Sequence, residues 1–322
     1  MKALIIDRVS PVVKMGLESY GVKVDVNILP EREILKKLLP QYDLLVMRVD
    51  PKMDKEMLNA AANHIKMIAI CSAGTNHVDM EYANKIGITI QNAPGINSNA
   101  VAELTLAKMI ELSRMTVIAN NEVQNEGLWD KYKYTGHELK GHLLGIIGLG
   151  HIGKRVATLA QAFGMQTIAY DPYIPDSDFR EVNTGKTENL YQICKECDYI
   201  SVHTPLNKET RGIISKELVE IMKPSAILIN CARGGLVDEN AIYDALKNKK
   251  IAGYGADVLA NELAGKGLLD NAKVSSPLFG LNNFIITPHV GGSTHEAYDH
   301  IGEYIVHKVV EFYGLKNTNS NI

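Results

Sequence analysis

The segment that most constrains the fold is 143–171, LLGIIGLGHIGKRVATLAQAFGMQTIAYD. Its apolar run Leu143–Ile147 predicts a buried parallel strand, which leads directly into the pattern G-x-G-x-x-G. Apolar residues then recur at helical spacing: Ile152, Val156, Leu159 and Phe163. A second apolar run, 167–170, ends at Asp171. Strand, glycine-rich turn, helix, strand and acidic residue thus follow in the order that a dinucleotide-binding unit requires.

Each glycine of this pattern has a separate expected use. Gly148 permits a tight turn, Gly150 lets the backbone approach a pyrophosphate, and Gly153 lets the helix lie close to the strand. The first N–H groups of the helix and its positive dipole end then face the phosphates. Asp171 is placed to accept both ribose hydroxyls, and Gly164 is expected to cap the helix. The alternative is that the glycine spacing arose by chance. Chance does not explain why the strand, the helix and the acidic residue also follow in the expected order.

Length and composition limit the class of protein. The chain has 322 residues, 46% hydrophobic and 22% charged, which is enough for two globular domains with separate cores. A formal net charge of −3 gives no electrostatic basis for binding nucleic acid or an anionic membrane. No apolar run is long enough to span a bilayer, and the chain reaches Asp7 too early for a signal peptide. We therefore expect a cytoplasmic protein with a small-molecule partner.

The four cysteines favour packing over chemistry. Cys71 and Cys231 end apolar runs, and Cys194-x-x-Cys197 lies on a predicted helix before the next strand. A lone CxxC without a second pair or a nearby histidine is a weak metal or redox signal. We expect no metal site.

Short apolar runs alternate with helical segments along the chain: Leu4–Ile6, Leu44–Met47, Met67–Ile70, Ile88–Ile90, Leu143–Ile147, Thr167–Tyr170, Tyr199–Val202, Ala226–Ile229, Ile251–Gly255 and Phe284–Ile286. This alternation predicts an α/β fold with parallel sheets covered by helices on both faces, of the Rossmann-like or flavodoxin-like kind.

The glycine-rich pattern lies in the middle of the chain, so a separate α/β unit precedes the cofactor domain. The turn-forming segment 92–99 marks the crossing into an apolar helix over 100–119. A further helix, over 294–313, closes the chain and is expected to pack back on the first unit. We therefore expect a first unit made of 1–98 and 293–322, with the unit that carries the glycine-rich pattern, 99–292, inserted in it.

Three loops that follow strands of the second half carry candidate chemistry, because an open α/β sheet binds ligands at its carboxyl edge. Arg233 precedes two glycines, and its planar fork suits a carboxylate; the alternative is a salt bridge to a neighbouring helix. Asp257 and Glu262 share the next loop, where either alone is usually a solvated charge. His289, followed by two glycines after Val290, is a general acid/base candidate, although most histidines are structural.

Together these residues form a working set for hydride transfer on a 2-hydroxy acid. Arg233 would clamp the substrate carboxylate and polarise the C2 oxygen, and His289 would remove the C2 hydroxyl proton. Glu262 would accept a hydrogen bond from the other ring nitrogen, fixing the tautomer and favouring the imidazolium. Asp257 would hold the nicotinamide carboxamide.

The chain resembles the NAD-dependent D-2-hydroxyacid dehydrogenases over nearly its whole length. The matching motifs are AGTNHVD at 73–79, GLGHIG at 148–153, HTPLNKETRGII at 203–214, NCARGGLVDE at 230–239 and TPHVGGST at 287–294. Within that family the similarity is greatest to the D-3-phosphoglycerate dehydrogenase branch, in GLWDKYKYTGHELKG, YDPY and NCARGG. By this resemblance we expect a short form without the C-terminal regulatory domains. The resemblance also implies that 1–98 with 293–322 is a discontinuous substrate domain and that 99–292 is an NAD-binding Rossmann domain.

The resemblance implies a division of roles among the motif residues. Arg233, Glu262 and His289 would be catalytic. The segment Ser72–Asn76, and within it Ser72, Ala73 and Gly74 in particular, would line the substrate site together with Arg233 and His289. The residues implied to bind NAD are Thr75, Gly148, Gly150, His151, Ile152, Gly153, Asp171, His203, Thr204, Pro205, Cys231, Ala232, Arg233, Asp257, His289, Gly291 and Gly292. The family also implies a homodimer formed through the cofactor domain by the helix after Asn99.

The chain departs from the family pattern in three places. Asn76-His77 stands where many relatives have Asp-Asn, and Leu263 follows Glu262 where Pro is frequent. The span from Glu262 to His289 is longer than in phosphoglycerate-type relatives. The extra loop, 263–283, carries Lys266 and Lys273 and could alter substrate choice.

One arginine of the first unit bears on the choice of substrate. Arg48 follows the strand 44–47 within MRVDPK and resembles an anion-binding arginine of phosphoglycerate dehydrogenases, which makes 3-phospho-D-glycerate the leading candidate. Arg48 could equally be a solvated loop charge. Other 2-keto acids (hydroxypyruvate, glyoxylate or D-lactate type), a formate- or phosphonate-oxidising relative and a non-catalytic NAD(H)-sensing corepressor are the alternatives. Asp171, followed by no arginine in 172–175, favours NAD over NADP.

Overall fold

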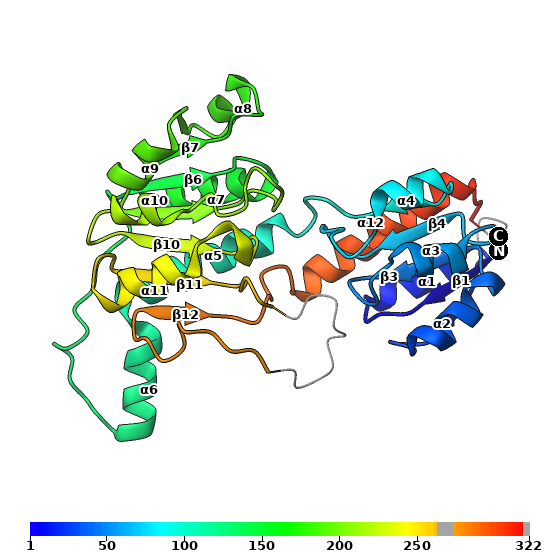
Figure 1. Cartoon of the computed structure of the whole chain (residues 1–322), viewed down its shortest axis with the longest axis horizontal. Helices are drawn as coiled ribbons and strands as arrows, with labels where there is room; N and C mark the ends of the chain where they lie inside the picture. The colour runs from blue at the N-terminus through cyan, green and yellow to red at the C-terminus, as the bar shows by residue number, and fades with distance from the viewer. Residues whose placement is uncertain (263–272, 318–322) are drawn as a thin grey trace. The chain divides into compact units, whose positions relative to one another are not determined.

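The computed structural model describes residues 1–262 and 273–317, which form two compact units. Unit 1 contains residues 1–97 and 293–317, and unit 2 contains residues 98–262 and 273–292 (Figure 1). The predicted domain boundaries, 98/99 and 292/293, concern domains that fold separately, and they stay a prediction. Lys266 lies outside the described residues.

Unit 1 is a five-stranded parallel sheet in the order β2-β1-β3-β4-β5. Its strands are β1 (Lys2–Ile5), β2 (Lys23–Val26), β3 (Leu44–Met47), β4 (Met67–Ile70) and β5 (Thr89–Gln91). Its helices are α1 (Pro11–Ser19), α2 (Arg32–Leu38), the 3₁₀ turn η1 (Leu39–Gln41), α3 (Lys55–Ala61), α4 (Met80–Lys85) and α12 (His295–Tyr313). The closing helix α12 packs on α1, where a Cβ on Gly16 would lie 2.8 Å from Val306. The expectation that it returns to the first unit is confirmed.

Unit 2 is a seven-stranded parallel sheet in the order β12-β11-β10-β9-β6-β7-β8. Its strands are β6 (Leu143–Ile147), β7 (Gln166–Tyr170), β8 (Gly185–Lys186), β9 (Tyr199–Val202), β10 (Ile227–Asn230), β11 (Gly253–Ala256) and β12 (Phe284–Ile286). Its helices are α5 (Ser98–Arg114), α6 (Thr116–Glu126), α7 (His151–Ala162), α8 (Asp176–Glu181), α9 (Leu190–Glu196), α10 (Lys216–Glu220), the 3₁₀ turn η2 (Gly234–Leu236) and α11 (Glu239–Lys247). Strand order reverses at β6, which pairs with β7 on one side and β9 on the other.

The predicted α/β class with two parallel sheets is confirmed. Strands β3, β4, β9 and β10 are buried along their whole length, which is why their sequences are apolar apart from Ser201 in β9 and Asn230 in β10. Two edge strands were not predicted, β2 and β8, because KVDV and the pair Gly185–Lys186 carry no such run. All four cysteines are free and buried, and burial raises the pKa of each thiol to about 12.

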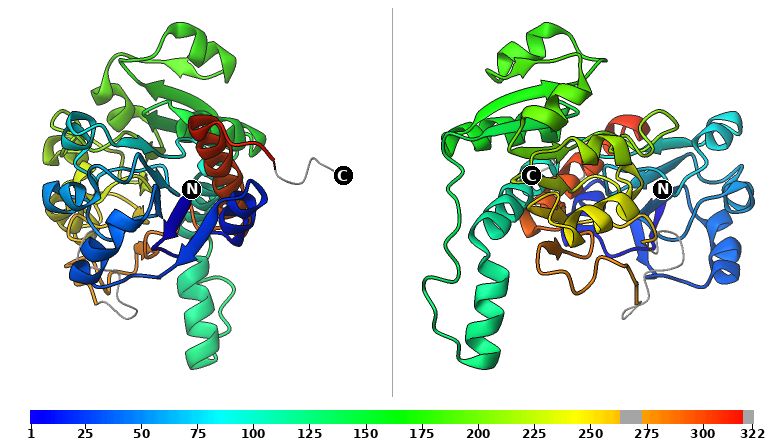
Figure 2. Two further views of the ribbon diagram at one scale, coloured as in Figure 1. Left: turned by 90° about the vertical axis from the view of Figure 1, so that its right-hand side faces the viewer. Right: turned by 60° about the vertical axis from the view of Figure 1, so that its left-hand side comes forward.

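The helix predicted over 100–119 is wrong in its extent. Helix α5 ends at Arg114, Met115 has φ 52°, and a separate helix α6 runs to Glu126. The backbone N–H of His137 donates to the carbonyl of Ser113, so the returning segment takes an acceptor that a continuous helix would need. None of the side chains of α6 is buried, and the helix extends away from the rest of its unit (Figure 2).

The predicted apolar face of α7 is wrong at one position. Gly153, Val156, Ala157 and Ala160 are buried, whereas Phe163 is 48% exposed. Within the described residues, no helix combines the length and the apolar character needed to cross a membrane.

Candidate active site

The glycine-rich turn between β6 and α7 has the geometry that its sequence predicts. Gly148 has φ 92°, and a Cβ there would lie 2.9 Å from the backbone of His203. A Cβ on Gly153 would lie 2.1 Å from the carbonyl oxygen of Gly148, so the helix packs against the turn in a way only glycine allows. By contrast, a Cβ on Gly150 would meet no atom within 4 Å. The space beside Gly150 is where a ligand can approach the backbone.

Asp171 lies at the end of β7, next to this turn. One carboxylate oxygen accepts from the backbone N–H of Leu149 (2.9 Å) and the other from that of Tyr173 (3.0 Å). These two bonds fix the carboxylate between the glycine-rich turn and the segment after β7. Gly164 follows α7 with φ 78° and ends the helix as predicted.

The end of β9 contributes buried polar atoms beside Gly148. His203 Nε2 lies 2.6 Å from the hydroxyl of Ser201, whereas His203 Nδ1 and Thr204 Oγ1 are buried with no hydrogen-bond partner among the described residues. Burial lowers the pKa of His203 to about 3, so its ring is neutral at physiological pH. Unpartnered buried donors and acceptors cost free energy unless something satisfies them, which fits a ligand-binding strand end.

Strands β10, β11 and β12 are neighbours in the sheet, so the loops that follow them emerge side by side. The first of these loops carries Arg233. The side chain of Asn230 accepts from Ala232 N (3.0 Å) and donates to Arg233 O (2.8 Å), and one guanidinium N–H of Arg233 donates to Ala232 O. Asn230 therefore fixes the backbone on both sides of the peptide that leads into Arg233.

Asp257 holds the loop that carries His289. The side chain of Asp257 is 1% exposed and accepts from Thr287 Oγ1 (2.5 Å), Val290 N (3.0 Å) and Gly291 N (2.7 Å). His289 itself has φ 54°, a left-handed conformation that a non-glycine residue keeps only where its surroundings enforce it. Holding this turn is the visible role of Asp257, and its predicted contact with a nicotinamide carboxamide stays a prediction.

His289 and Glu262 form the central pair of the candidate site. His289 Nδ1 lies 3.1 Å from Glu262 Oε2, and both side chains remain accessible, at 47% and 25% exposure. The carboxylate orients the ring through Nδ1, and Nε2, which has no hydrogen bond to any residue that the structure describes, can exchange a proton with a ligand. This arrangement can perform general acid–base catalysis.

Unit 1 places the other predicted residues at the carboxyl ends of β3 and β4. The guanidinium of Arg48 lies 4.6 Å from the ring centroid of Tyr298 and donates to Ser293 Oγ (3.2 Å), and Ser72 Oγ donates to the carbonyls of Arg48 and Gly74. Within the described residues Arg48 has no carboxylate within 4 Å. The neighbouring loop from Ala73 to Thr75 is partly exposed.

Sequence reasoning missed the residues that hold these loops. One carboxylate oxygen of Asp7 accepts from the backbone N–H groups of Arg48 and Val49, and Asn230 and Glu239 hold loops of unit 2. Asp7 comes two residues after strand β1, so a lone acid near the end of an apolar strand was the available signal. Lys108 was missed too: it is 1% exposed on α5, and burial lowers its pKa.

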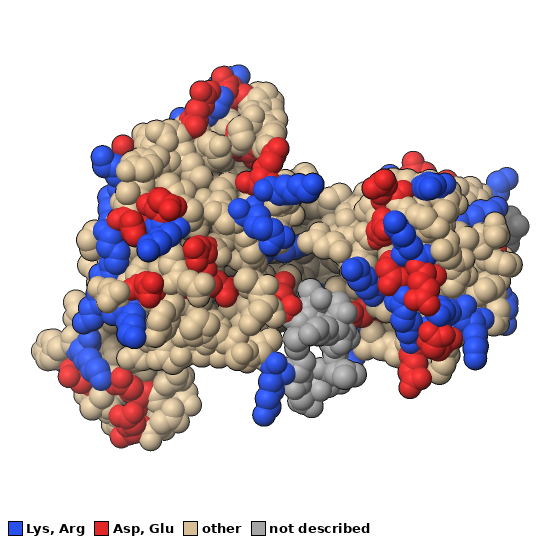
Figure 3. All heavy atoms as spheres, viewed as in Figure 1, with Lys and Arg blue, Asp and Glu red and all other residues tan. Residues whose placement is uncertain are grey.

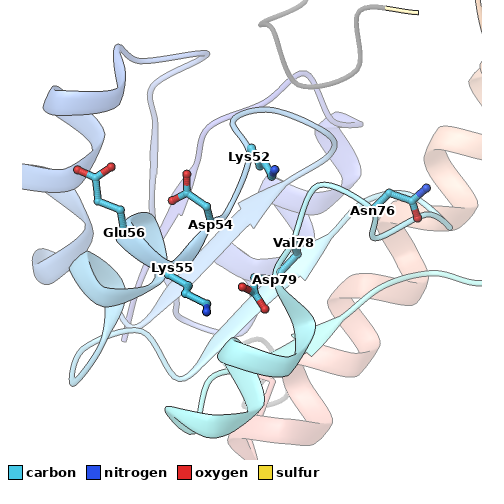
Figure 4. Close-up of a pocket in the computed structure, with 7 residues that line it drawn as sticks. All are labelled: Lys52, Asp54, Lys55, Glu56, Asn76, Val78 and Asp79. Carbon is cyan, nitrogen blue, oxygen red and sulfur yellow. The ribbon is translucent and has the colours of Figure 1, made fainter. Parts of the chain in front are cut away.

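A separate pocket of 470 Å³ in unit 1 is lined by Lys52, Asp54, Lys55, Glu56, Asn76, Val78 and Asp79 (Figure 4). Its carboxylates already have partners: Asp54 and Glu56 bind Arg32, and Asp79 caps α4 through Tyr82 N. Basic and acidic side chains lie next to one another over this unit (Figure 3). Asn76 is the one predicted substrate residue in its lining, so the pocket is mostly distinct from the predicted site.

Comparisons with known proteins identify the family to which the chain belongs. Residues 106–291, more than half of the chain, match the family described as D-isomer specific 2-hydroxyacid dehydrogenase, NAD binding domain. The chain belongs to this family, and residues 106–291 form its NAD-binding domain.

The names of similar proteins state several different activities. The chain is 38% identical to D-3-phosphoglycerate dehydrogenase of Methanocaldococcus jannaschii over 91% of its own length and 54% of the relative's. It is 37% identical to hydroxypyruvate reductase of Thermotoga maritima over 88% of this chain and 89% of that protein. A solved structure of D-lactate dehydrogenase from Aquifex aeolicus, complexed with NAD and lactic acid, matches with a TM-score of 0.83 and 30% identity, covering 97% and 95% of the two chains. The chain spans about half the length of the phosphoglycerate dehydrogenases that it matches.

Proposed function

We propose that this protein transfers a hydride between NAD(H) and C2 of a small D-2-hydroxy acid or its 2-keto partner. The observation that carries the proposal is the His289–Glu262 pair, at 3.1 Å, on the loops that follow β12 and β11, the two strands next in the sheet to the β10 strand of Arg233. These are the groups that the oxidation of an alcohol beside a carboxylate needs: a base, a residue that orients the base, and a cation for the carboxylate.

The residues around the glycine-rich turn fit NAD. Open space beside Gly150 suits a pyrophosphate, Asp171 suits the ribose hydroxyls, and unpartnered Thr204 Oγ1 lies next to the turn. The remaining residues proposed to hold NAD are Thr75, Gly148, His151, Ile152, Gly153, His203, Pro205, Cys231, Ala232, Arg233, Asp257, His289, Gly291 and Gly292. When bound, NAD supplies the acceptor for the hydride that leaves C2.

The chain's own residues carry the rest of the reaction. Arg233 binds the C1 carboxylate and polarises the C2 oxygen, while His289 Nε2 takes the hydroxyl proton as the C2–H bond breaks toward the cofactor. Glu262 stabilises the imidazolium that this proton uptake creates. The products are the 2-keto acid, NADH and a proton on His289, and in the reverse direction the same nitrogen returns the proton.

Cofactor preference follows from Asp171. A carboxylate at this position accepts from the 2′-hydroxyl of NAD and repels the 2′-phosphate of NADP, and 172–175 contains no arginine. Catalytic efficiency with NAD should exceed that with NADP by roughly tenfold or more, which corresponds to about 1.4 kcal/mol. Equal efficiency with both cofactors would contradict the assignment of Asp171.

We propose a substrate with an acidic group at C3, with 3-phospho-D-glycerate as the leading candidate. Arg48 supports it, because its guanidinium is partly buried against Tyr298 and has no carboxylate within 4 Å among the described residues. The names of similar proteins keep hydroxypyruvate and glyoxylate as alternatives. Arg48 would bind the acidic group at C3, and Arg233 the C1 carboxylate.

Reduction of a panel of 2-keto acids, measured by nicotinamide absorbance, tests both the dehydrogenase activity and the choice of substrate. 3-Phosphohydroxypyruvate should be reduced more efficiently than hydroxypyruvate, pyruvate, glyoxylate and 2-ketoisocaproate. Arg48→Gln should lower kcat/KM for the phosphorylated acid by about 10- to 150-fold, the equivalent of a charge-assisted hydrogen bond worth about 1.5–3 kcal/mol, and leave pyruvate unchanged. The control is Lys52→Gln, which should alter neither. Turnover of unsubstituted keto acids alone rejects the phosphoglycerate assignment, and no turnover at all favours the NAD(H)-sensing corepressor.

We also propose that the protein is a homodimer formed through unit 2. Helix α6 buries none of its side chains within the chain, and the segment after it exposes Trp129 at 85% and Tyr132 at 77%. Exposed aromatic residues beside an unpacked helix are typical of a subunit interface. Light scattering should give twice the monomer mass, and Trp129→Ser with Tyr132→Ser should shift it toward the monomer.

A further inference from the structure

Glu239 holds a segment of unit 2 that lies far from it in sequence. It is the first residue of α11, where Asp238 already caps the helix by accepting from the N–H groups of Asn240 and Ala241. The carboxylate of Glu239 is therefore not needed as a cap. One of its oxygens instead accepts from the backbone N–H of Ala260 at 2.7 Å, 21 residues further along the chain.

The segment that Glu239 holds is the turn that carries Glu262. Glu262 N donates to Leu259 O (3.2 Å), which closes the turn over 259–262. The same peptide, between Leu259 and Ala260, also packs against Gly234, where a Cβ would lie 2.0 Å from the carbonyl carbon of Leu259. Two contacts therefore hold the turn, one with the residue that follows Arg233 and one with the side chain of Glu239.

The electrostatics also couple the two carboxyl groups. Partial burial raises the pKa of Glu239, the hydrogen bond from Ala260 opposes that shift, and the nearby charge of Glu262 adds to it. An acid that served only to offset the helix dipole in the first turn would be exposed to solvent, and it would not need a backbone donor from a distant segment.

We propose that Glu239 is a positioning residue that holds the Ala260–Glu262 turn, so that Glu262 meets His289 at hydrogen-bond distance. The inference rests on the proposed dehydrogenase function and adds to it a residue that acts through Glu262, without touching substrate. Its loss should weaken the chemical step and leave cofactor binding intact, because the glycine-rich turn lies elsewhere in the sheet.

The test compares variants that keep or remove the acceptor. Glu239→Gln retains a side-chain carbonyl for Ala260 N and should keep kcat within about threefold of wild type, whereas Glu239→Ala should lose roughly tenfold or more in kcat, part of the 10²–10⁴ that general acid–base catalysis supplies. The dissociation constant of NADH, followed by its fluorescence, should stay within about twofold in both variants. A matched control is Glu217→Ala, which removes another first-turn acid from α10 and should have no effect.

Two further variants protect the test against misfolding. Glu239→Asp keeps the charge but withdraws the oxygen by one methylene, so it should also lower kcat. In the Glu262→Gln background, Glu239→Ala should add little further loss, because residues that act through one another are not additive. Wild-type kcat in Glu239→Ala, equal losses in the Ala and Gln variants, or full additivity with Glu262→Gln would each overturn the inference. If wild-type protein turns over no acid of the panel, the proposed function fails instead.

Discussion

Two charged regions of the molecule, the loops around His289 in unit 2 and the pocket beside α3 in unit 1, differ in whether their carboxylates fix segments that are distant in sequence. In unit 2, Asp257 and Glu239 accept from backbone N–H groups and fix the course of the chain. In the pocket, the backbone donors to Asp54 and Asp79 lie in the first turns of the helices that these residues cap, α3 and α4. Glu56 pairs with the side chains of Arg32 and Lys36 at the surface. Exposed ion pairs of this kind contribute little to stability.

This difference shows where chemistry is to be expected. Carboxylates that bind backbone N–H groups hold loops in single conformations, as the left-handed His289 requires, and catalytic groups need such fixed geometry. Side-chain ion pairs on flexible stems do not impose it. The size of a cavity is therefore a poor guide to the active site of this protein, because the 470 Å³ pocket has almost none of the predicted site residues in its lining.

The largest expected effect comes from the catalytic histidine. His289→Gln should lower kcat by about 10²–10⁴, because it removes proton transfer, and should weaken NADH binding far less than it lowers kcat. Lys55→Gln, in the lining of the pocket, is the matched substitution and should leave kcat unchanged. Nicotinamide absorbance and fluorescence measure the two quantities. A kcat in His289→Gln near that of wild type would remove the basis for placing chemistry in unit 2.

The next effect separates two glycines of the cofactor turn. In Gly153→Ala the new Cβ would lie 2.1 Å from the carbonyl oxygen of Gly148, so the turn must move, at a cost of about 1–3 kcal/mol in the free energy of unfolding. Gly150→Ala should fold as stably as wild type, since no atom lies within 4 Å of its Cβ, and should bind NADH roughly tenfold more weakly. Thermal melts and NADH titration distinguish the two. Unchanged NADH affinity in Gly150→Ala would show that the open space is not the pyrophosphate site.

The sequence predicted much of this region because the relevant information is local. A strand, the glycine spacing and an acid at the end of the next strand define the cofactor turn within 29 residues, 143–171. The meeting of the Arg233, Glu262 and His289 loops follows from the order of β10, β11 and β12, which consecutive parallel strands commonly adopt.

What the sequence did not reveal depends on contacts between distant segments. The break after Arg114 arises where His137 binds the carbonyl of Ser113, while the apolar pattern of the helix continues past it. Asn230, Glu239 and Asp7 hold loops through partners whose positions only the fold defines. Lys108 is buried although nothing in its helical pattern marks it as such.

The comparison is tested most directly by neutralising one carboxylate of each kind. Asp257→Asn places an N–H₂ group against the donors Thr287 Oγ1, Val290 N and Gly291 N, so at least one is left unsatisfied, at a cost of about 1–3 kcal/mol in the free energy of unfolding. Glu56→Gln, at the surface of unit 1, should not change the midpoint of urea unfolding measurably. Equal stability of the two variants would contradict the distinction between anchoring and surface carboxylates.

The smallest effect concerns the enclosed His203 and the pH dependence of stability. Its folded-state pKa of about 3 lies below the value of an unfolded histidine, so the unfolded chain takes up a proton that the folded chain does not as the pH falls below 6.5. Between pH 7.5 and 5.5 this difference should lower the free energy of unfolding by about 1.4 kcal/mol. His203→Gln keeps a polar group for Ser201 and removes the titration, so its loss over this interval should be smaller by that amount. Urea unfolding at the two pH values measures it, with the exposed His64→Gln as the control that should retain the wild-type loss. A loss in His203→Gln as large as in wild type would mean that the imidazole is accessible to protons in the folded protein.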